Sequence, residues 1–219
     1  MPDLRETQTY YLRLTPLRHF CTWLGGVIFN PLFDIRASGL QHLPPHGPVI
    51  LAPNHVTNFD VILMQLSLSR PFFPMAKAEL FRHPTLGWFF RQLGAFPVKR
   101  GLADLWAMTH AAKVLEAGNV LCIFPEGTRT RGRGLVEGKG GAAYLAFKHN
   151  APVIPMGVVG TDRLFKPWYK RSPVGIHLGE PLWPAVNETA DAFTERLMLA
   201  LARLLPPEYR GVYAARIQE

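Results

Sequence analysis

From residue 34 onward, short apolar runs suited to strands alternate with stretches of helical periodicity. The expected strands lie at 35–38, 48–52, 72–76, 120–124, 153–159 and 175–178. Helical patterns fill the intervals, at 59–69, 86–93, 102–116, 141–148 and 191–205. Runs such as Val-Leu-Cys-Ile-Phe at 120–124 are apolar throughout, which is typical of strands covered on both faces of a parallel sheet. The sequence therefore predicts an α/β fold: a single-domain sandwich with a largely parallel central sheet flanked by helices, plus an N-terminal amphipathic helix.

The chain is expected to divide into three segments. Residues 1–32 form an N-terminal amphipathic segment, residues 33–205 the main domain, and residues 206–219 a C-terminal tail. No internal repeat, low-complexity segment or interdomain linker is visible, and 219 residues suit one domain with a sizeable core.

The N-terminal segment carries an apolar stripe that has two interpretations. Helical spacing relates Leu14, Leu17, Cys21, Leu24 and Ile28. The uncharged stretch between Arg18 and Asp34 has 15 residues, fewer than the ~20 that a spanning helix needs. The stripe therefore either packs on the domain or lies in a membrane surface as an interfacial helix that ends near Asn30. Residues 1–20 mix both charge signs, which gives no sign of a secretory signal.

The positive charge of the chain is concentrated. The net charge is +8, yet residues 77–100, 129–139 and 161–171 together carry +10. This concentration favours a bound phosphate or an acidic carrier, and solvated loops are the alternative. No nucleic acid is expected as a partner, because 129–139 lacks the interleaved aromatic residues of such a surface. No metal is expected either, since two cysteines and eight scattered histidines give no ligand spacing.

A polar run, Asn-His-Val-Thr-Asn-Phe-Asp over 54–60, follows the expected strand 48–52. Chemistry in open α/β folds takes place on loops at the carboxyl ends of strands. Histidine suits proton transfer at neutral pH, and a carboxylate on its other ring nitrogen fixes the tautomer. Five residues of a helix turn through about 500°, so His55 and Asp60 meet only if the helix begins after His55. Taken alone, this spacing is weak evidence for a catalytic pair.

A second polar run follows the expected strand 120–124. It contains Glu126, Gly127, Thr128 and Arg129, and continues to Arg131 and Arg133. Arginine binds phosphate or carboxylate through two parallel hydrogen bonds, and glycine lets backbone N–H groups approach an anion. Taken alone, this run is more typical of a solvated basic turn.

Four segments in this order resemble the glycerolipid acyltransferase family, the lysophosphatidic acid acyltransferases. They are Asn54-His55 with Asp60, a segment from Lys77 to Arg100, Phe-Pro-Glu-Gly-Thr-Arg at 124–129, and Pro-Val-Ile-Pro at 152–155. The similarity extends over residues 33–182, most of the chain.

The resemblance implies roles for these residues. His55 would be the general base that takes the proton of the acceptor hydroxyl, and Asp60 would orient and stabilise it. The acceptor's glycerol phosphate would be bound by Glu126, Gly127, Thr128, Arg129, Arg100, Lys77 and Lys99. Attack would fall directly on an acyl thioester, either acyl-CoA or an acyl carrier protein, with no other cofactor. The chain has four serines and no Gly-x-Ser-x-Gly elbow, which agrees with a reaction without an acyl-enzyme.

The implied reaction acylates the sn-2 hydroxyl of 1-acylglycerol-3-phosphate and gives phosphatidic acid for phospholipid synthesis. The enzyme would be peripheral or monotopic on the cytoplasmic face of a membrane, with the membrane surface, a lysophospholipid and the acyl donor as partners.

Two departures from the family pattern leave the acceptor open. Gly140 stands where a second lysine often follows, and Pro-Val-Lys-Arg at 97–100 lacks the usual acidic residue. The alternatives are a lyso-ornithine lipid, a glycolipid or another lysophospholipid. A non-catalytic lipid-binding protein is a further alternative, against which the intact His55 and Asp60 count.

Overall fold

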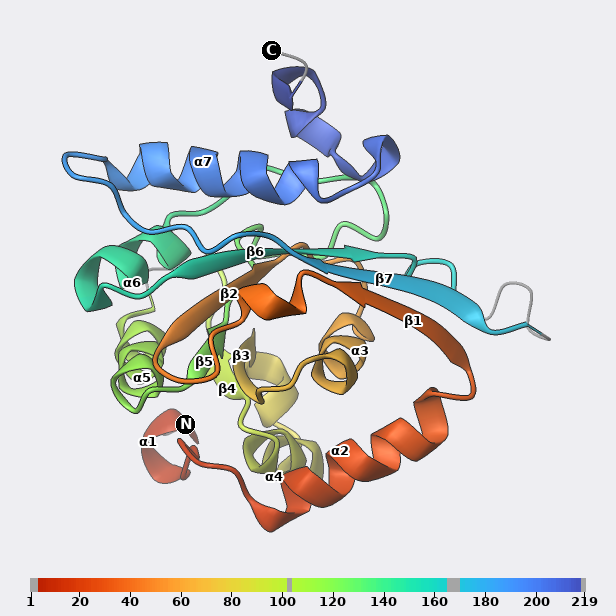
Figure 1. Ribbon diagram of the computed structural model, residues 1–219. Coiled ribbons are helices and arrows are strands. Elements are labelled where there is room, and N and C mark those ends of the chain that lie inside the picture. Colours follow the sequence, from red (N-terminus) through yellow and green to blue (C-terminus); the bar gives the residue numbers. More distant parts are fainter. Residues whose placement is uncertain (1–3, 102–103, 165–169, 218–219) are drawn as a thin grey trace.

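The computed structural model describes residues 4–101, 104–164 and 170–217, and its helices cover both faces of one sheet (Figure 1). The seven strands lie in the order β1-β7-β6-β2-β5-β3-β4. Neighbouring strands are parallel except β6 and β7, which are antiparallel. The strands are β1 Phe33–Ser38, β2 Val49–Pro53, β3 Phe72–Lys77, β4 Phe96–Val98, β5 Val120–Cys122, β6 Val153–Val159 and β7 Ser172–Leu178. The predicted α/β sandwich with a largely parallel sheet is confirmed.

The helices divide between the two faces of the sheet. They are α1 Leu4–Thr7, α2 Pro16–Phe29, α3 Asp60–Ser67, α4 Pro84–Gln92, α5 Leu105–Glu116, α6 Gly141–His149 and α7 Ala190–Arg203. Side chains of β2 alternate between two buried cores: Ile50 and Ala52 pack with α5, α6 and α7, whereas Val49 and Leu51 pack with α3. This alternation follows from the period of two along a strand, and it explains why β2 is apolar at every position.

The N-terminal helix α2 begins at Pro16, after Thr15, whose side chain accepts a hydrogen bond from the backbone N–H of Arg18. The helix lies on the outer side of α3 and beside α4 (Figure 1). The predicted apolar stripe is split: Leu24 and Ile28 are exposed, whereas Cys21 is half-buried. Leu14 precedes the helix and is not part of it. Among the described residues, no helix is both long and apolar enough to cross a bilayer.

The structure differs from the predicted elements at several points. The strand β4 was not expected, because it is only three residues long and contains Pro97; it lies at the edge of the sheet, where the missing N–H of a proline is tolerated. The strands β1 and β7 begin two and three residues earlier than predicted, at Phe33 and Ser172. The first two residues of the predicted helix 102–116 and the middle of the basic segment 161–171 lie outside the described residues.

The C-terminal residues contribute to the core. Beyond α7 the chain forms short 3₁₀ helices at Pro207–Tyr209, Gly211–Tyr213 and Ala215–Ile217. Tyr209 and Tyr213 are buried against α7. Leu135 donates its backbone N–H to the carbonyl of Tyr209 and accepts from the N–H of Val212, so the C-terminal segment holds the loop that follows β5.

Candidate active site

Two loops at the carboxyl ends of β2 and β5 carry the residues that the sequence singled out. The first loop spans residues 54–59 and ends where α3 begins, at Asp60. His55 Nδ1 lies 2.8 Å from Asp60 Oδ2. The same oxygen accepts the backbone N–H groups of Val56 and Thr57, at 2.8 and 2.9 Å. The loop therefore wraps around the carboxylate, which meets the geometric condition for pairing two residues five apart.

Asp60 is fully buried and has a second set of donors that the sequence did not predict. The Thr161 hydroxyl donates to Asp60 Oδ1 at 2.6 Å, and the Thr57 hydroxyl lies 3.3 Å from the same oxygen. Thr161 is buried and follows β6, which pairs with β2 in the sheet. A hydroxyl just beyond a strand adjacent to β2 is the signal that could have pointed to it.

The side chain of Asn54 fixes the start of the same loop. Its Nδ2 donates to the carbonyl of Val158 at 2.9 Å, and its Oδ1 accepts the Val158 N–H at 2.6 Å. These two bonds take the place of those that a longer β2 would make to Val158, so the amide continues the β2–β6 pairing while the backbone turns away. The loop that carries His55 is therefore anchored to the sheet.

The imidazole of His55 also contacts an aromatic ring, which packs on one of its faces. The ring of Phe124 is stacked on it, with centroids 3.9 Å apart and planes inclined by 26°. With Nδ1 directed at Asp60, the other ring nitrogen, Nε2, is the atom available for exchange of a proton with a substrate.

The Glu126 carboxylate lies behind His55 and is buried. Its Oε1 accepts the backbone N–H of His55 at 2.8 Å, and its Oε2 accepts that of Val136 at 3.2 Å. Burial raises the pKa of Glu126 to about 7, and the nearby charge of Asp60 also raises it, whereas the two N–H donors lower it. Backbone bonds from Thr130 N–H to the His55 carbonyl further join the two loops. Glu126 thus braces the histidine loop, and its predicted contact with a substrate stays a prediction.

A cavity of about 510 Å³ extends from His55 between α2, α3 and α4. Its walls are mostly apolar, and they include Cys21, Phe29, Val61, Leu66, Phe72, Leu80, Phe89 and Leu93. Three of the predicted substrate-binding cations, Lys77, Arg100 and Arg129, line the same cavity as His55. We call it the larger cavity.

The three cations are held differently. Arg129 Nη1 donates to the Asn58 side chain at 2.7 Å, and the Lys77 ammonium lies 3.6 Å from Glu79. Desolvation lowers the pKa of Arg100, and the positive charge of Arg129 lowers it further. Because the two guanidinium groups repel each other, an anion bound by both would be stabilised.

The other predicted residues lie elsewhere. Lys99 and Gly127 line a second cavity of about 440 Å³, which we call the smaller cavity. Thr128 is exposed, and neither Thr128 nor Glu126 lines either cavity. The structure thus brings His55, Asp60, Lys77, Arg100 and Arg129 to one site and leaves the remaining substrate-binding predictions at its periphery. Among the described residues, no cluster of side chains is suited to a metal ion.

A family model described as Acyltransferase matches residues 34–159, more than half of the chain. The chain belongs to the acyltransferase family. The matched range contains both loops and all the predicted site residues of this acyltransferase, whereas α2, Thr161 and α7 lie outside it.

Curated relatives of this acyltransferase carry related names. A 1-acyl-sn-glycerol-3-phosphate acyltransferase of Bacillus subtilis is 30% identical over 167 residues, which is 76% of this chain and 82% of that one. A chloroplastic enzyme of the same name from Arabidopsis thaliana is 29% identical over 67% of this chain, which spans only 42% of that relative's length. A lyso-ornithine lipid O-acyltransferase of Pseudomonas aeruginosa is 32% identical over a stretch that covers 66% of this chain and 55% of that relative's length.

The fold of this acyltransferase also has a solved counterpart. The crystal structure of the 1-acyl-sn-glycerophosphate (LPA) acyltransferase PlsC from Thermotoga maritima superposes with a TM-score of 0.68. The match covers 85% of this chain and 78% of that chain at 22% sequence identity, so it supports the fold alone.

Proposed function

We propose that this protein transfers a fatty acyl group from an acyl thioester to the sn-2 hydroxyl of 1-acylglycerol-3-phosphate. The observation that carries the proposal is the hydrogen-bonded pair of His55 and Asp60, which opens into an apolar cavity beside Lys77, Arg100 and Arg129. A proton acceptor, an apolar compartment and a cluster of cations are what a phosphorylated lipid acceptor and a fatty acyl chain require.

The proposed reaction proceeds by direct attack. His55 Nε2 takes the proton of the acceptor hydroxyl as its oxygen bonds to the thioester carbonyl carbon, and Asp60 stabilises the imidazolium. The tetrahedral intermediate collapses with cleavage of the carbon–sulfur bond, and the leaving thiolate recovers the proton from His55. The products are phosphatidic acid and the free thiol of the donor.

An acyl-enzyme is not part of the proposal. Among the described residues, no serine lines either cavity. The two thiols are poor nucleophiles, because burial raises the pKa of both Cys21 and Cys122. Cys122 also lies wholly within the core.

The acceptor phosphate is assigned to Arg129, Arg100 and Lys77. Arginine pairs hold a phosphate dianion through charge-assisted hydrogen bonds, and the three cations share a cavity with the base. This arrangement favours a phosphorylated acceptor over a lyso-ornithine lipid, the second candidate, which the Pseudomonas relative's name suggests.

We also propose that the protein docks on the cytoplasmic face of a membrane. Large apolar side chains are exposed on α2 and around the larger cavity, namely Phe20, Trp23, Leu24, Val27, Ile28, Phe59, Ile62, Leu80, Leu86, Trp88 and Phe89. A patch of this size supports an interfacial contact through which a lipid substrate reaches the cavity. Sedimentation with phospholipid vesicles tests it: the protein is expected in the pellet, and a protein that stays in the supernatant would contradict docking.

The acceptor assignment is tested by a panel of lipids. The purified protein is incubated in mixed micelles with acyl-CoA or acyl carrier protein and with lysophosphatidic acid, lyso-ornithine lipid or monoacylglycerol. Phosphatidic acid is the expected main product, and monoacylglycerol, which lacks the phosphate, is expected to react poorly. Acylation of lyso-ornithine lipid but not of lysophosphatidic acid would replace the proposed acceptor by the second candidate.

A further inference from the structure

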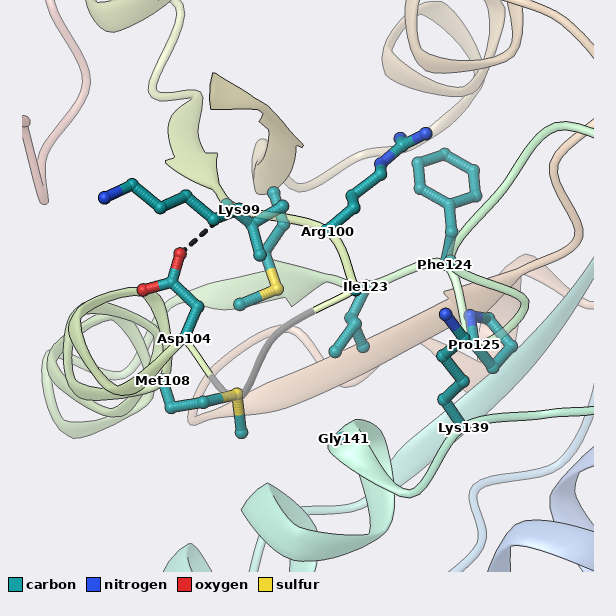
Figure 2. A pocket seen from close by; sticks show the side chains of 13 residues that line it. Lys99, Arg100, Asp104, Met108, Ile123, Phe124, Pro125, Lys139 and Gly141 are labelled. Atoms are coloured by element: carbon teal, nitrogen blue, oxygen red, sulfur yellow. Dashed lines mark hydrogen bonds between the residues drawn. The ribbon is translucent and has the colours of Figure 1, made fainter. Parts of the chain in front are cut away.

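The smaller cavity has Phe124 but not His55 among its lining residues, and it has no role in the proposed reaction. It is bounded by the ends of β4 and β5 and by the start of α6 (Figure 2). Met75, Val98, Met108 and Ile123 supply apolar walls. Phe124, Arg100 and Met75 line both cavities, so the two compartments meet at these side chains.

Lys139 is an exposed residue that lines this cavity and brings a positive charge to it. Its side chain extends along Pro125 toward Phe124 (Figure 2). It also packs on Gly127, where an added Cβ would lie 3.0 Å from Nζ and 3.2 Å from Cδ and Cε. The Lys139 backbone N–H donates to the carbonyl of Pro125 at 2.8 Å, which fixes the start of this side chain. Within the described part of the chain, no carboxylate or carbonyl accepts from the Lys139 ammonium.

Other features of the smaller cavity also favour an anion. Arg100, which is assigned to the acceptor phosphate, lines this cavity as well, and Figure 2 shows its guanidinium beside the ring of Phe124; its charge therefore acts on both compartments. The nine-residue helix α6 begins there at Gly141, so the positive end of its dipole adds to the field. The acidic member, Asp104, is already neutralised: it pairs with Arg5 at 2.6 Å and accepts backbone N–H bonds from Lys99 and Ala107.

Direct acyl transfer needs two phosphorylated substrates bound at the same time. The acceptor carries a phosphate a few bonds from its reactive hydroxyl, so that phosphate must lie close to His55, where Arg129 and Lys77 line the larger cavity. The donor carries its phosphate at the end of the longer pantetheine arm that leads away from the thioester. The smaller cavity has a cation and apolar walls of its own and does not include His55, so it is the compartment left for that arm.

We propose that the smaller cavity binds the phosphopantetheine arm of the acyl donor and that Lys139 holds its phosphate. The inference rests on the proposed acyl transfer. The thioester would lie at Phe124 beside His55, with the fatty chain in the larger cavity and the arm in the smaller one. Acyl-CoA and acyl carrier protein share this arm, so the site serves either donor.

The test measures the KM of three thioesters of one fatty acid: acyl-CoA, acyl-phosphopantetheine and acyl-pantetheine. In the wild-type protein, loss of the phosphate is expected to raise the donor KM about tenfold, as for one charge-assisted hydrogen bond at a solvated site. Lys139→Met is expected to abolish this preference and leave the acceptor KM unchanged, whereas Lys139→Arg retains it. Lys113→Met removes the same charge from a likewise exposed position on α5 that lines neither cavity, and it is the matched control. Acylated carrier protein, run in parallel, is expected to respond as acyl-CoA does.

Two kinetic results would overturn the inference. A rise in the acceptor KM alone in Lys139→Met would assign the smaller cavity to the acceptor, and an unchanged preference for the phosphorylated donor would remove Lys139 from the donor site. Calorimetric binding of CoA itself gives a readout that is independent of turnover. About tenfold weaker binding to Lys139→Met than to Lys113→Met supports the donor site even if the acceptor assignment fails, and equal binding contradicts it.

Discussion

Replacement of Thr161 by valine tests whether the loop beyond β6 positions the proposed catalytic pair, His55 and Asp60. The change removes one hydroxyl and keeps the shape of the side chain. It leaves Asp60 Oδ1 with only the 3.3 Å contact from the Thr57 hydroxyl, in place of the 2.6 Å bond from Thr161. Both partners are buried, so no water replaces the lost donor readily. A buried hydrogen bond to a charged group contributes about 1.5–3 kcal/mol.

The expected losses follow from that value. For a chain of this size, each kcal/mol shifts the melting temperature by about 2–4 °C, so Thr161→Val should melt about 3–12 °C lower. Turnover should fall while the KM of both substrates stays the same, because the lost contact orients the base and touches neither substrate. Thr161→Ser keeps the donor and is the control. A valine variant that melts and turns over like the serine variant would refute this role for Thr161.

Two further substitutions distinguish a residue that supports the His55 loop, Glu126, from one that binds the acceptor, Arg129. Glu126→Gln places an amide NH₂ against one of the two backbone N–H donors, which loses that hydrogen bond and disturbs the loop that carries His55. The kcat should therefore fall with little change in the acceptor KM. A rise in the acceptor KM alone would instead assign Glu126 to the acceptor. Burial raises the pKa of Glu126 from 4.5 to about 7, so between these pH values the folded state keeps a proton that the unfolded state loses. The free energy of unfolding of the wild type should therefore fall as the pH rises from 4.5 to about 7. Denaturant titrations of Glu126→Gln should lack this slope. Arg129→Ala should raise the acceptor KM by about 10- to 150-fold, the equivalent of about 1.5–3 kcal/mol, and leave the donor KM unchanged. An equal rise in both KM values would assign Arg129 another role.

The sheet could be predicted because its strands obey a simple pattern. The runs at β2 and β6 are apolar at nearly every position, as strands covered on both faces must be, and glycine or proline separates them from their neighbours. The short strand β4 escaped because Pro97 argues against a strand, and only its edge position makes it possible.

The contact between His55 and Asp60, the proposed catalytic pair, could be predicted only conditionally. The spacing of His55 and Asp60 is local, so the start of α3 decides whether they meet, and the loop satisfies that condition with backbone donors to the carboxylate. Thr161 contacts Asp60 across 101 residues of sequence, and no local pattern predicts such a contact.

The sequence could not predict the directions in which the side chains of Glu126 and Lys139 point. Glu126 lies in a run of polar residues that reads as a surface turn, yet its carboxylate faces inward onto backbone N–H groups of His55 and Val136. The role of Lys139 likewise depends on the turn at Gly127, whose φ of 64° lets the lysine pack on the backbone. Tertiary packing determines the directions of both side chains, and neither composition nor local sequence pattern predicts that packing.

The most direct test of the account is the rate of phosphatidic acid formation by wild-type protein and by His55→Ala. Each is assayed with lysophosphatidic acid and acyl-CoA or acyl carrier protein, and the fold of the variant is checked by its melting curve. We expect that the wild type forms phosphatidic acid and that the folded variant loses at least a hundredfold in turnover, as for removal of a general base. Comparable turnover by a folded His55→Ala variant would contradict the central role of this histidine.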